Sequence, residues 1–166
     1  MTIGWVLGFV DGEGCFSIGL VRQAGGGQRK GYRLGWQVVH RFVVVQGARS
    51  LPALEQLRDF FGIGRLYVNR RHDNHRENLY QFVVDRRADL VDVVIPFFER
   101  FPLRTDKRRD FERFAHCVHL VEIGRHLDTD GLIEIVTTME AMNHRKARTD
   151  VIRILRDQTP NIPTAG

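Results

Sequence analysis

Two acidic residues, Asp11 and Glu13, end a glycine-rich, apolar stretch near the start of the chain. Read as a helix, this stretch carries both acids in its last turn, where the helix macrodipole is already negative and acids are disfavoured. A bound cation would offset that charge, and Mg²⁺ is bound in proteins through one or two carboxylates. The two acids therefore predict a metal site at the end of a helix. Glycines and acids also end helices as plain C-caps and turns, which is the alternative interpretation.

Three glycines, Gly4, Gly8 and Gly12, recur at every fourth residue of this stretch. On a helix they share one face, and they leave a groove that another backbone could approach closely. Each interior glycine costs about 1 kcal/mol relative to alanine, so three on one face favour a close helix–helix contact. Apolar residues fill the other faces. The pattern predicts a buried helix rather than an amphipathic surface helix.

Residues 6–14 resemble the signature motif of the LAGLIDADG homing endonucleases, which they match position by position. Leu7, Gly12 and Glu13 stand where the namesake motif has alanine, alanine and aspartate. Leucine is bulkier on a packed helix, and glutamate keeps the carboxylate but lengthens its reach. The resemblance implies that the motif helices of two subunits, or of two halves of one chain, pack at a two-fold axis. It also implies that their last acids meet at the metal sites.

The motif occurs once in the chain, so one chain supplies half of such an active site. We therefore expect a homodimer with the same surface used by both copies. The expected dimer interface consists of Gly4, Leu7, Gly8, Asp11 and Gly12. Because a two-fold protein favours a two-fold target, the DNA site is expected to be palindromic or nearly so.

Composition bounds the class of protein. The chain has 166 residues, of which 43% are hydrophobic, enough for one domain with a real core. Its net charge of +5 favours an acidic partner such as nucleic acid. No apolar run approaches the ~18 residues that a membrane span needs, so we expect an intracellular protein, in an organelle (chloroplast or mitochondrion) or a prokaryotic cytoplasm. Cys15 and Cys117 are expected to be free thiols.

Hydrophobic patterning and turn residues predict the order of elements. After the first helix we expect strands at 15–21 and 32–46, a helix at 51–61 with Ser50 as N-cap, a hairpin of strands at 66–71 and 79–85, and helices at 87–98, 107–124, 130–142 and 147–157. This order predicts an α+β fold with one four-stranded antiparallel sheet and helices on one face. The resemblance implies an αββαββα unit with a saddle-shaped sheet. We expect one domain over 1–166, with a core at about 3–125 and C-terminal helices at about 129–157.

The open face of the sheet is expected to meet DNA. Alternation with a period of two sends odd and even residues of the second strand to opposite faces. The even residues are nearly all apolar and should pack on the helices, while the odd residues include arginine and glutamine, which suit guanine and adenine edges. A half-solvated sheet face is the alternative. The resemblance implies that this sheet lies in the major groove and that the first strand also contributes. The expected DNA-binding residues are Ser17, Gly19, Val21, Arg33, Gly35, Gln37, Val39, Arg41, Arg65, Tyr67, Asn69, Arg71 and Gln81.

Phosphodiester cleavage needs a metal to polarise the phosphate and activate a water, and positive charge to offset the charge that develops. Mg²⁺ is the expected ion, and other divalent ions such as Mn²⁺ or Ca²⁺ also fit such a site. The resemblance implies that Glu13 is a direct ligand, with the backbone carbonyl of Gly12 beside it. Asp11 lies two residues away, roughly 200° round a helix, so both acids cannot face one metal. We expect Asp11 to be structural and to bond backbone at the junction between helix and strand.

Two further catalytic residues are implied by the resemblance alone. Gln46, at the end of the second strand, falls where a relative has a glutamine that orders waters near the cleaved bond. Lys107 lies in the segment where the family places a basic residue beside the scissile phosphate, and Arg104 or Arg108 is the alternative counterpart. Together with Arg109, these side chains also suit contacts with the phosphate backbone. A helix N-terminal region with solvated charges is the alternative interpretation.

The resemblance, together with these residues, implies a metal-dependent endodeoxyribonuclease. We expect a site-specific double-strand break in a long, near-palindromic DNA target, which promotes the mobility of a host intron or intein. Two alternatives share the fold: a DNA-binding regulator that does not cut, and a maturase that binds intron RNA. The acid Glu13 favours the enzyme, since a pure binder has no need of an acid facing phosphates.

Overall fold

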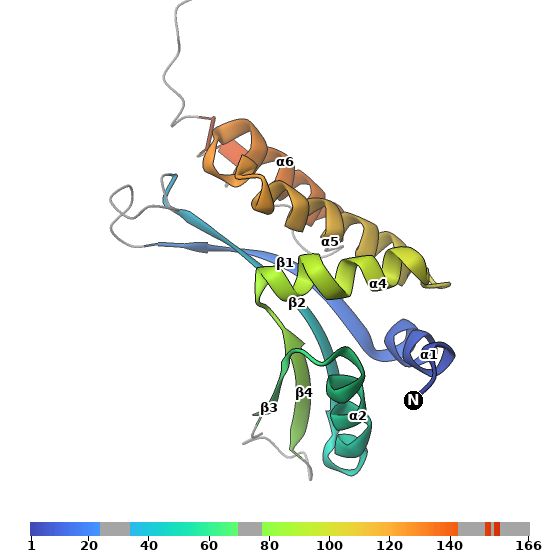
Figure 1. Cartoon of the computed structure of the whole chain (residues 1–166). Coiled ribbons are helices and arrows are strands. Elements are labelled where there is room, and N and C mark those ends of the chain that lie inside the picture. The colour runs from blue at the N-terminus through green and yellow to red at the C-terminus, as the bar shows by residue number, and fades with distance from the viewer. Residues whose placement is uncertain (24–33, 70–77, 143–151, 154, 157–166) are drawn as a thin grey trace, which may run out of the picture.

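The computed structural model describes residues 1–23, 34–69, 78–142, 152–153 and 155–156 (Figure 1). The first part of the chain forms α1 (Ile3–Glu13), β1 (Gly14–Arg22), β2 (Trp36–Gly47), the short turn η1 (Ala48–Ser50), α2 (Leu51–Phe61), β3 (Arg65–Asn69) and β4 (Leu79–Val84). The second part forms α3 (Arg87–Asp89), η2 (Leu90–Val94), α4 (Ile95–Arg100), α5 (Lys107–Glu122), η3 (Arg125–Leu127) and α6 (Thr129–Met142). The hairpin tip and most of the helix expected at 147–157 lie outside the described residues.

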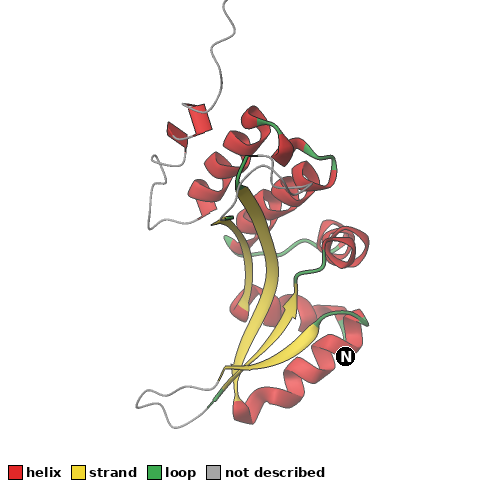
Figure 2. Ribbon diagram, turned by 90° about the vertical axis from the view of Figure 1, so that its left-hand side faces the viewer, coloured by secondary structure: helices red, strands yellow, loops and turns green. Residues whose placement is uncertain are grey.

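All strand pairs of the sheet are antiparallel, and the strand order is β1-β2-β4-β3. Figure 2 shows the curved sheet with helices gathered on one of its faces. This arrangement confirms the predicted α+β fold with one four-stranded sheet. The curvature makes the other face of the sheet concave (Figure 2).

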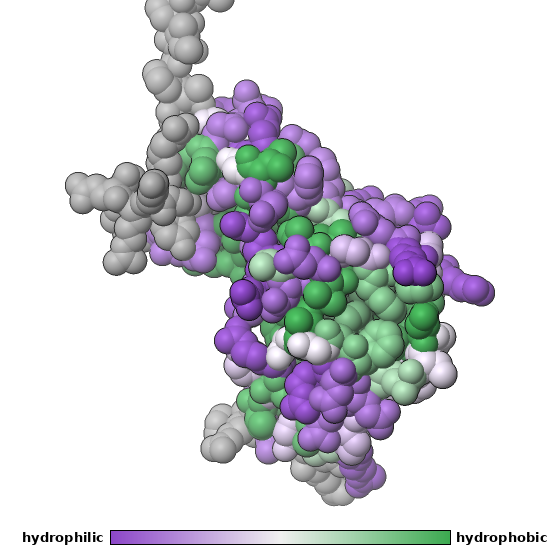
Figure 3. All heavy atoms as spheres, viewed as in Figure 1, coloured by the Kyte–Doolittle hydropathy of each residue, from purple (hydrophilic) through white to green (hydrophobic). Residues whose placement is uncertain are grey.

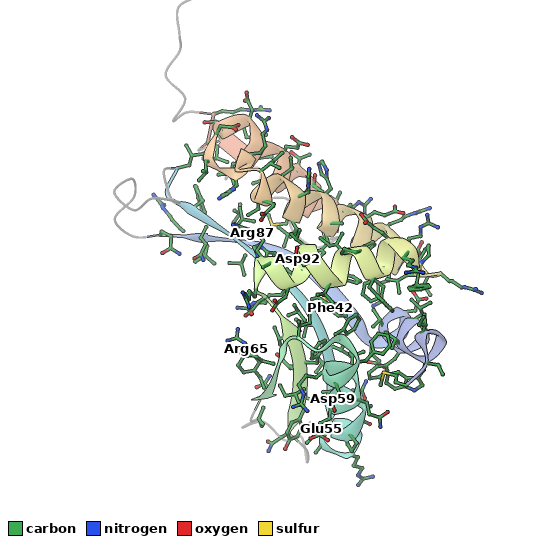
Figure 4. The ribbon with its side chains drawn as sticks, viewed as in Figure 1. Phe42, Glu55, Asp59, Arg65, Arg87 and Asp92 are labelled. Atoms are coloured by element: carbon green, nitrogen blue, oxygen red, sulfur yellow. The ribbon has the colours of Figure 1, made fainter. Side chains whose placement is uncertain are left out.

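The core forms between the helices and one face of the sheet. In β2 the even residues Val38, Phe42 and Val44 are buried, as the period-two pattern predicts. Phe42 is fully buried and lies where the sheet meets the helices (Figure 4). Its ring stacks on Phe16 of β1, with centroids 5.0 Å apart, and contacts the edge of Phe98 of α4. These aromatic contacts fix the sheet against the helices.

Two local predictions differ from the structure. The helix expected at 87–98 is a run of α3, η2 and α4 that continues to Arg100, with the wider π-type turn at Leu90–Val94. Pro96 has no N–H to donate to the carbonyl of Asp92, and the backbone widens just before it. Ser50 makes no side-chain cap bond, because it already ends the turn η1 and lacks the extended backbone of an N-cap.

The helix α1 is less buried in the single chain than its sequence predicts. Only Val6 and Val10 are buried, while the side chains of Ile3 and Trp5 remain 40% and 38% exposed. Figure 3 shows apolar side chains gathered on the surface between α1 and α4. Within the described residues, Cys15 and Cys117 are free thiols, as predicted. No described helix combines the length and the apolar character needed to cross a membrane.

Candidate active site and DNA-binding face

The last turn of α1 brings the predicted metal ligand to the surface. Glu13 is the final residue of this helix, and its side chain is exposed. Gln46 lies two residues beyond Val44, the β2 partner of Gly14, so it stands at the α1 end of the sheet. Neither Glu13 nor Gln46 makes a side-chain hydrogen bond to any residue that the structure describes. Both polar groups are therefore free to bind a ligand or water.

Lys107 reaches this end of α1 from the first turn of α5. Its ammonium group donates a hydrogen bond to the carbonyl oxygen of Gly14, the residue that follows Glu13. The two alternative basic residues are engaged differently. The guanidinium of Arg108 pairs with Glu112 at 2.9 Å, and Arg104 is exposed, with its backbone N–H bonded to Asp11. Of these three side chains, that of Lys107 contacts the residue next to Glu13.

Asp11 faces the segment that leads into α5 rather than the predicted metal site. Its Oδ2 accepts a hydrogen bond from the backbone N–H of Arg104 at 2.9 Å, and its Oδ1 accepts from the hydroxyl and backbone N–H of Thr105 at 2.8 and 3.3 Å. Burial acts to raise the pKa of this carboxyl, but these hydrogen bonds and the charge of Lys107 together lower the pKa. Asp11 bonds backbone, as predicted, but it bonds the backbone of Arg104 and Thr105 rather than that of the helix–strand junction.

Two residues that position Lys107 escaped the sequence analysis. A Cβ added at Gly14 would lie 2.7 Å from the carbonyl oxygen of Val10, so glycine is required where the helix turns into β1. The hydroxyl oxygen of Thr105 accepts a hydrogen bond from the backbone N–H of Lys107 at 3.3 Å. The only sequence signal for Thr105 is its place before a helix start, where threonine commonly caps.

The donor set at the end of α1 fits a hard divalent cation. It consists of one exposed carboxylate, on Glu13, and the last backbone carbonyls of the helix, such as that of Gly12. Within the described residues, no group of three or more histidine, cysteine, aspartate or glutamate side chains could hold a metal by itself. Mg²⁺ accepts such a sparse set because it keeps waters and takes phosphate oxygens as ligands.

The sheet aligns the predicted DNA-binding residues in rows on its open face. Ser17 pairs with Arg41, Gly19 with Val39 and Val21 with Gln37 across β1 and β2. Tyr67 pairs with Gln81, and Asn69 with Leu79, across β3 and β4. Gly35 lies in the bend before β2 with a φ of 73°. Arg33 and Arg71 lie outside the described residues.

Several of these polar side chains are already held in place. The Arg65 guanidinium pairs with Asp85 at 2.7 Å and lies over the ring of Tyr67, and it points away from α2 (Figure 4). Gln23, which the sequence analysis did not select, donates from Nε2 to Oε1 of Gln37 at 2.7 Å. Gln23 lies two residues beyond Val21, so the period-two alternation predicts that the two side chains share a face. This spacing could have identified Gln23 from the sequence. Arg41 is exposed, so its guanidinium is open to a partner.

The glycine face of α1 is open in the single chain. A Cβ added at Gly4, Gly8 or Gly12 would meet no described atom within 4 Å. By contrast, Leu7 is partly buried against the core of its own chain. The structure therefore has room for another backbone on this face.

The chain belongs to the LAGLIDADG endonuclease family, whose model matches residues 6–118. Among its relatives is the homing endonuclease I-ApeII of Aeropyrum pernix, which is 30% identical over 152 residues that cover 92% of this chain and 72% of the relative. The probable intron-encoded endonuclease 3 of Neurospora crassa is 33% identical over 141 residues, 84% of this chain and 24% of the relative. An uncharacterised 50.9 kDa protein in ND4 intron 1 of Podospora anserina is 34% identical over 125 residues, 74% of this chain and 25% of the relative. The chain thus spans about a quarter of the length of the last two relatives.

Solved structures give the same family. The homing endonuclease I-TnaI matches with a TM-score of 0.76 and 36% identity, covering 95% of this chain and 97% of that one. I-SmaMI bound to an uncleaved DNA target in the presence of calcium ions matches with a TM-score of 0.77 and 25% identity, covering 100% of this chain but 54% of that one. Membership of the family confirms the resemblance that residues 6–14 carry.

Proposed function

We propose that the protein is a homing endonuclease that makes a metal-dependent double-strand break in a long, near-palindromic DNA target and so promotes the mobility of its host intron or intein. The observation that carries the proposal is the meeting of Lys107 with the carbonyl of Gly14, directly after Glu13. This contact places a cation that would act on the phosphate next to the residue whose carboxylate would bind the metal. The names of I-ApeII and I-TnaI as homing endonucleases support the same activity.

DNA is the proposed partner, and it lies along the open face of the sheet. Arg41 and Gln37 of β2 and Gln81 of β4 offer the hydrogen-bonding groups that read guanine and adenine in the major groove. The net charge of +5 favours binding to phosphates. All of this chain matches 54% of the I-SmaMI chain, and the DNA bound to I-SmaMI supports this placement.

In the proposed reaction a water attacks phosphorus and the bond to the leaving oxygen breaks. The Glu13 carboxylate and the Gly12 carbonyl would hold Mg²⁺, which would supply Lewis acidity and a water of lowered pKa. The Lys107 ammonium offsets negative charge on the phosphate as it develops. The Gln46 amide, at the same end of the sheet, holds the attacking water in line through its donor and acceptor groups.

A homodimer is the proposed active species. The open face of Gly4, Gly8 and Gly12 leaves room for a second copy of α1. The chain covers 97% of I-TnaI but only 54% of I-SmaMI, so it has about half the length of the DNA-bound neighbour. Two copies then supply two Glu13 carboxylates at one two-fold axis.

The experiment incubates the protein and Mg²⁺ with a library of near-palindromic duplexes, captures the cut ends and sequences them. We expect one family of related sites to be cut on both strands. Glu13→Gln should bind the selected site in Ca²⁺ but fail to cut it in Mg²⁺. Glu55→Gln, which removes an exposed acid from α2, is the matched control and should cut normally.

The outcomes separate the alternatives. Enrichment of one DNA sequence without any cutting would favour a regulator that only binds. Preference for folded intron RNA over duplex DNA would favour a maturase. Full cutting by Glu13→Gln would refute the assignment of the metal ligand.

A further inference from the structure

The Asp11 carboxylate joins α1 to the segment before α5 through three hydrogen bonds. Oδ2 accepts from the backbone N–H of Arg104, and Oδ1 accepts from both the N–H and the hydroxyl of Thr105. These donors lie 93 and 94 positions further along the chain. Asp11 thereby fixes the distance between the end of α1 and the start of α5.

Thr105 carries this connection into the first turn of α5. Its hydroxyl donates to Asp11 and accepts from the backbone N–H of Lys107, and its carbonyl accepts from the N–H of Arg108 at 3.0 Å. The Lys107 side chain then returns to the carbonyl of Gly14, three residues after Asp11. The bonds form a closed ring that runs from Asp11 through Thr105 and Lys107 to Gly14.

The ring restrains the two ends of the lysine separately. The backbone of Lys107 is held through Thr105, and its ammonium is held by Gly14. Holding the backbone matters because lysine has a long, flexible side chain, and a group that acts on a phosphate must be held close to its working geometry. Both carboxylate oxygens of Asp11 accept hydrogen bonds from the segment before α5, so the carboxylate serves this restraint.

We propose that Asp11 is a positioning residue that, through Arg104 and Thr105, sets Lys107 beside the scissile phosphate. The inference rests on the proposed function, in which Lys107 acts on that phosphate. Asp11 itself touches neither the DNA nor the metal. Its replacement should therefore slow cleavage without weakening the binding of the target.

The first test compares Asp11→Asn, Lys107→Met and the double variant on the target selected by the wild-type protein. Asparagine keeps the shape of aspartate but turns an N–H₂ group toward a donor, which removes at least one bond. We expect Asp11→Asn to slow single-turnover cleavage at saturating protein at least tenfold, with the Kd in Ca²⁺ unchanged within twofold. In the Lys107→Met background it should have no further effect. Additive slowing would overturn the inference, because Asp11 would then act independently of Lys107.

A second pair of variants covers the case in which Asp11→Asn fails to fold. Thr105 is exposed, so Thr105→Val removes the hydroxyl bridge with little loss of packing. We expect Thr105→Val to slow cleavage and Thr105→Ser to restore the wild-type rate. Normal cleavage by Thr105→Val, with Lys107→Met impaired, would overturn the inference and leave the proposed function intact.

A third measurement does not need cleavage. The chain has three lysines, Lys30, Lys107 and Lys146, so a protein labelled with ¹³C at lysine Cε gives three assignable NMR signals. Asp11→Asn should shift the Lys107 signal and leave the other two unchanged. An unchanged Lys107 signal would refute the inference. Failure of the wild-type protein to cut any DNA, with the Lys107 signal still dependent on Asp11, would refute the proposed function and leave only the positioning of Lys107 by Asp11.

Discussion

The Lys107 ammonium donates a hydrogen bond to the carbonyl oxygen of Gly14, 93 residues earlier in the chain. This contact places a positive charge against the first residue of β1, immediately after Glu13. It also meets the negative end of the α1 macrodipole, which a cation stabilises. The site proposed for cleavage is therefore organised before DNA binds.

Replacing Lys107 should impair chemistry more than binding. Lys107→Met keeps the length of the side chain but removes its charge, so we expect single-turnover cleavage to slow by about 10²- to 10³-fold, the usual loss for one group that stabilises developing charge. Affinity for the same site in Ca²⁺ should change little. Arg108→Gln is the matched control, because Arg108 pairs with Glu112 on the surface of α5. Equal losses in both variants would contradict a special role for Lys107.

Gly14 should not tolerate a side chain. In Gly14→Ala the new Cβ would lie 2.7 Å from both the carbonyl oxygen and the Cγ1 of Val10, so the helix end must shift. We expect the free energy of unfolding to fall by about 1–3 kcal/mol, as for other overpacked positions, and cleavage to slow because the carbonyl that holds Lys107 moves. Urea denaturation checks the first effect. Gly19→Ala, whose Cβ would meet no described atom within 4 Å, should be close to neutral.

The sequence predicts those parts of the structure that depend on local periodicity. Alternation in β2 assigns Phe42 to the core and Arg41 to the open face because successive side chains of a strand point to opposite sides. The same argument misses Asp11 and Thr105, since their contact depends on how α5 returns to α1 from 94 residues away. Spacing along one helix could exclude Asp11 from the metal, but it could not identify its partner.

The sequence predicts that α1 is buried, but its glycine face is open in one chain. Burial of this face therefore requires a second chain. We expect Gly8→Leu to fold, because a Cβ there meets no described atom within 4 Å and leucine has a better helix propensity by about 1 kcal/mol. The larger side chain should nevertheless block the approach of a second α1 and abolish cleavage. Analytical ultracentrifugation should show a dimer for the wild type and a monomer for this variant. Ala88→Leu, at an exposed position of α3, is the control and should remain dimeric.

Arg41 should contribute to sequence recognition rather than to cleavage chemistry. It is exposed on the open face of the sheet, opposite Ser17 in β1. We expect Arg41→Ala to weaken discrimination at one base pair of each half-site by about 1–3 kcal/mol, as for a lost bidentate contact. Selection of sites from a random library would show this as relaxed preference at one symmetric pair of positions. A uniform loss of affinity across all sequences would instead indicate a phosphate contact.

Two partly buried histidines make the stability of the fold depend on pH. His40 of β2 and His126 of η3 each have a buried Nδ1 without a hydrogen-bond partner among the described residues. Burial, and then the positive charge of Arg87, lower the pKa of both imidazoles below the ordinary value of 6.5, although Asp85 opposes this for His40. Arg87 itself pairs with Glu122 at 2.6 Å. The folded state therefore favours the neutral imidazoles.

This lowered pKa fixes the direction of the pH dependence. The unfolded chain binds these protons near pH 6.5, above the pH at which the folded chain does, so stability is fully present above pH 6.5 and is lost as the pH falls below it. We expect the urea midpoint of the wild type to drop between pH 7.5 and 5.5, and His40→Gln to flatten that drop. His119→Gln, which changes an exposed histidine of α5, should keep the wild-type slope. A midpoint that stays constant or rises on acidification would contradict the assignment, because it would mean that the folded chain binds these protons at least as readily as the unfolded one.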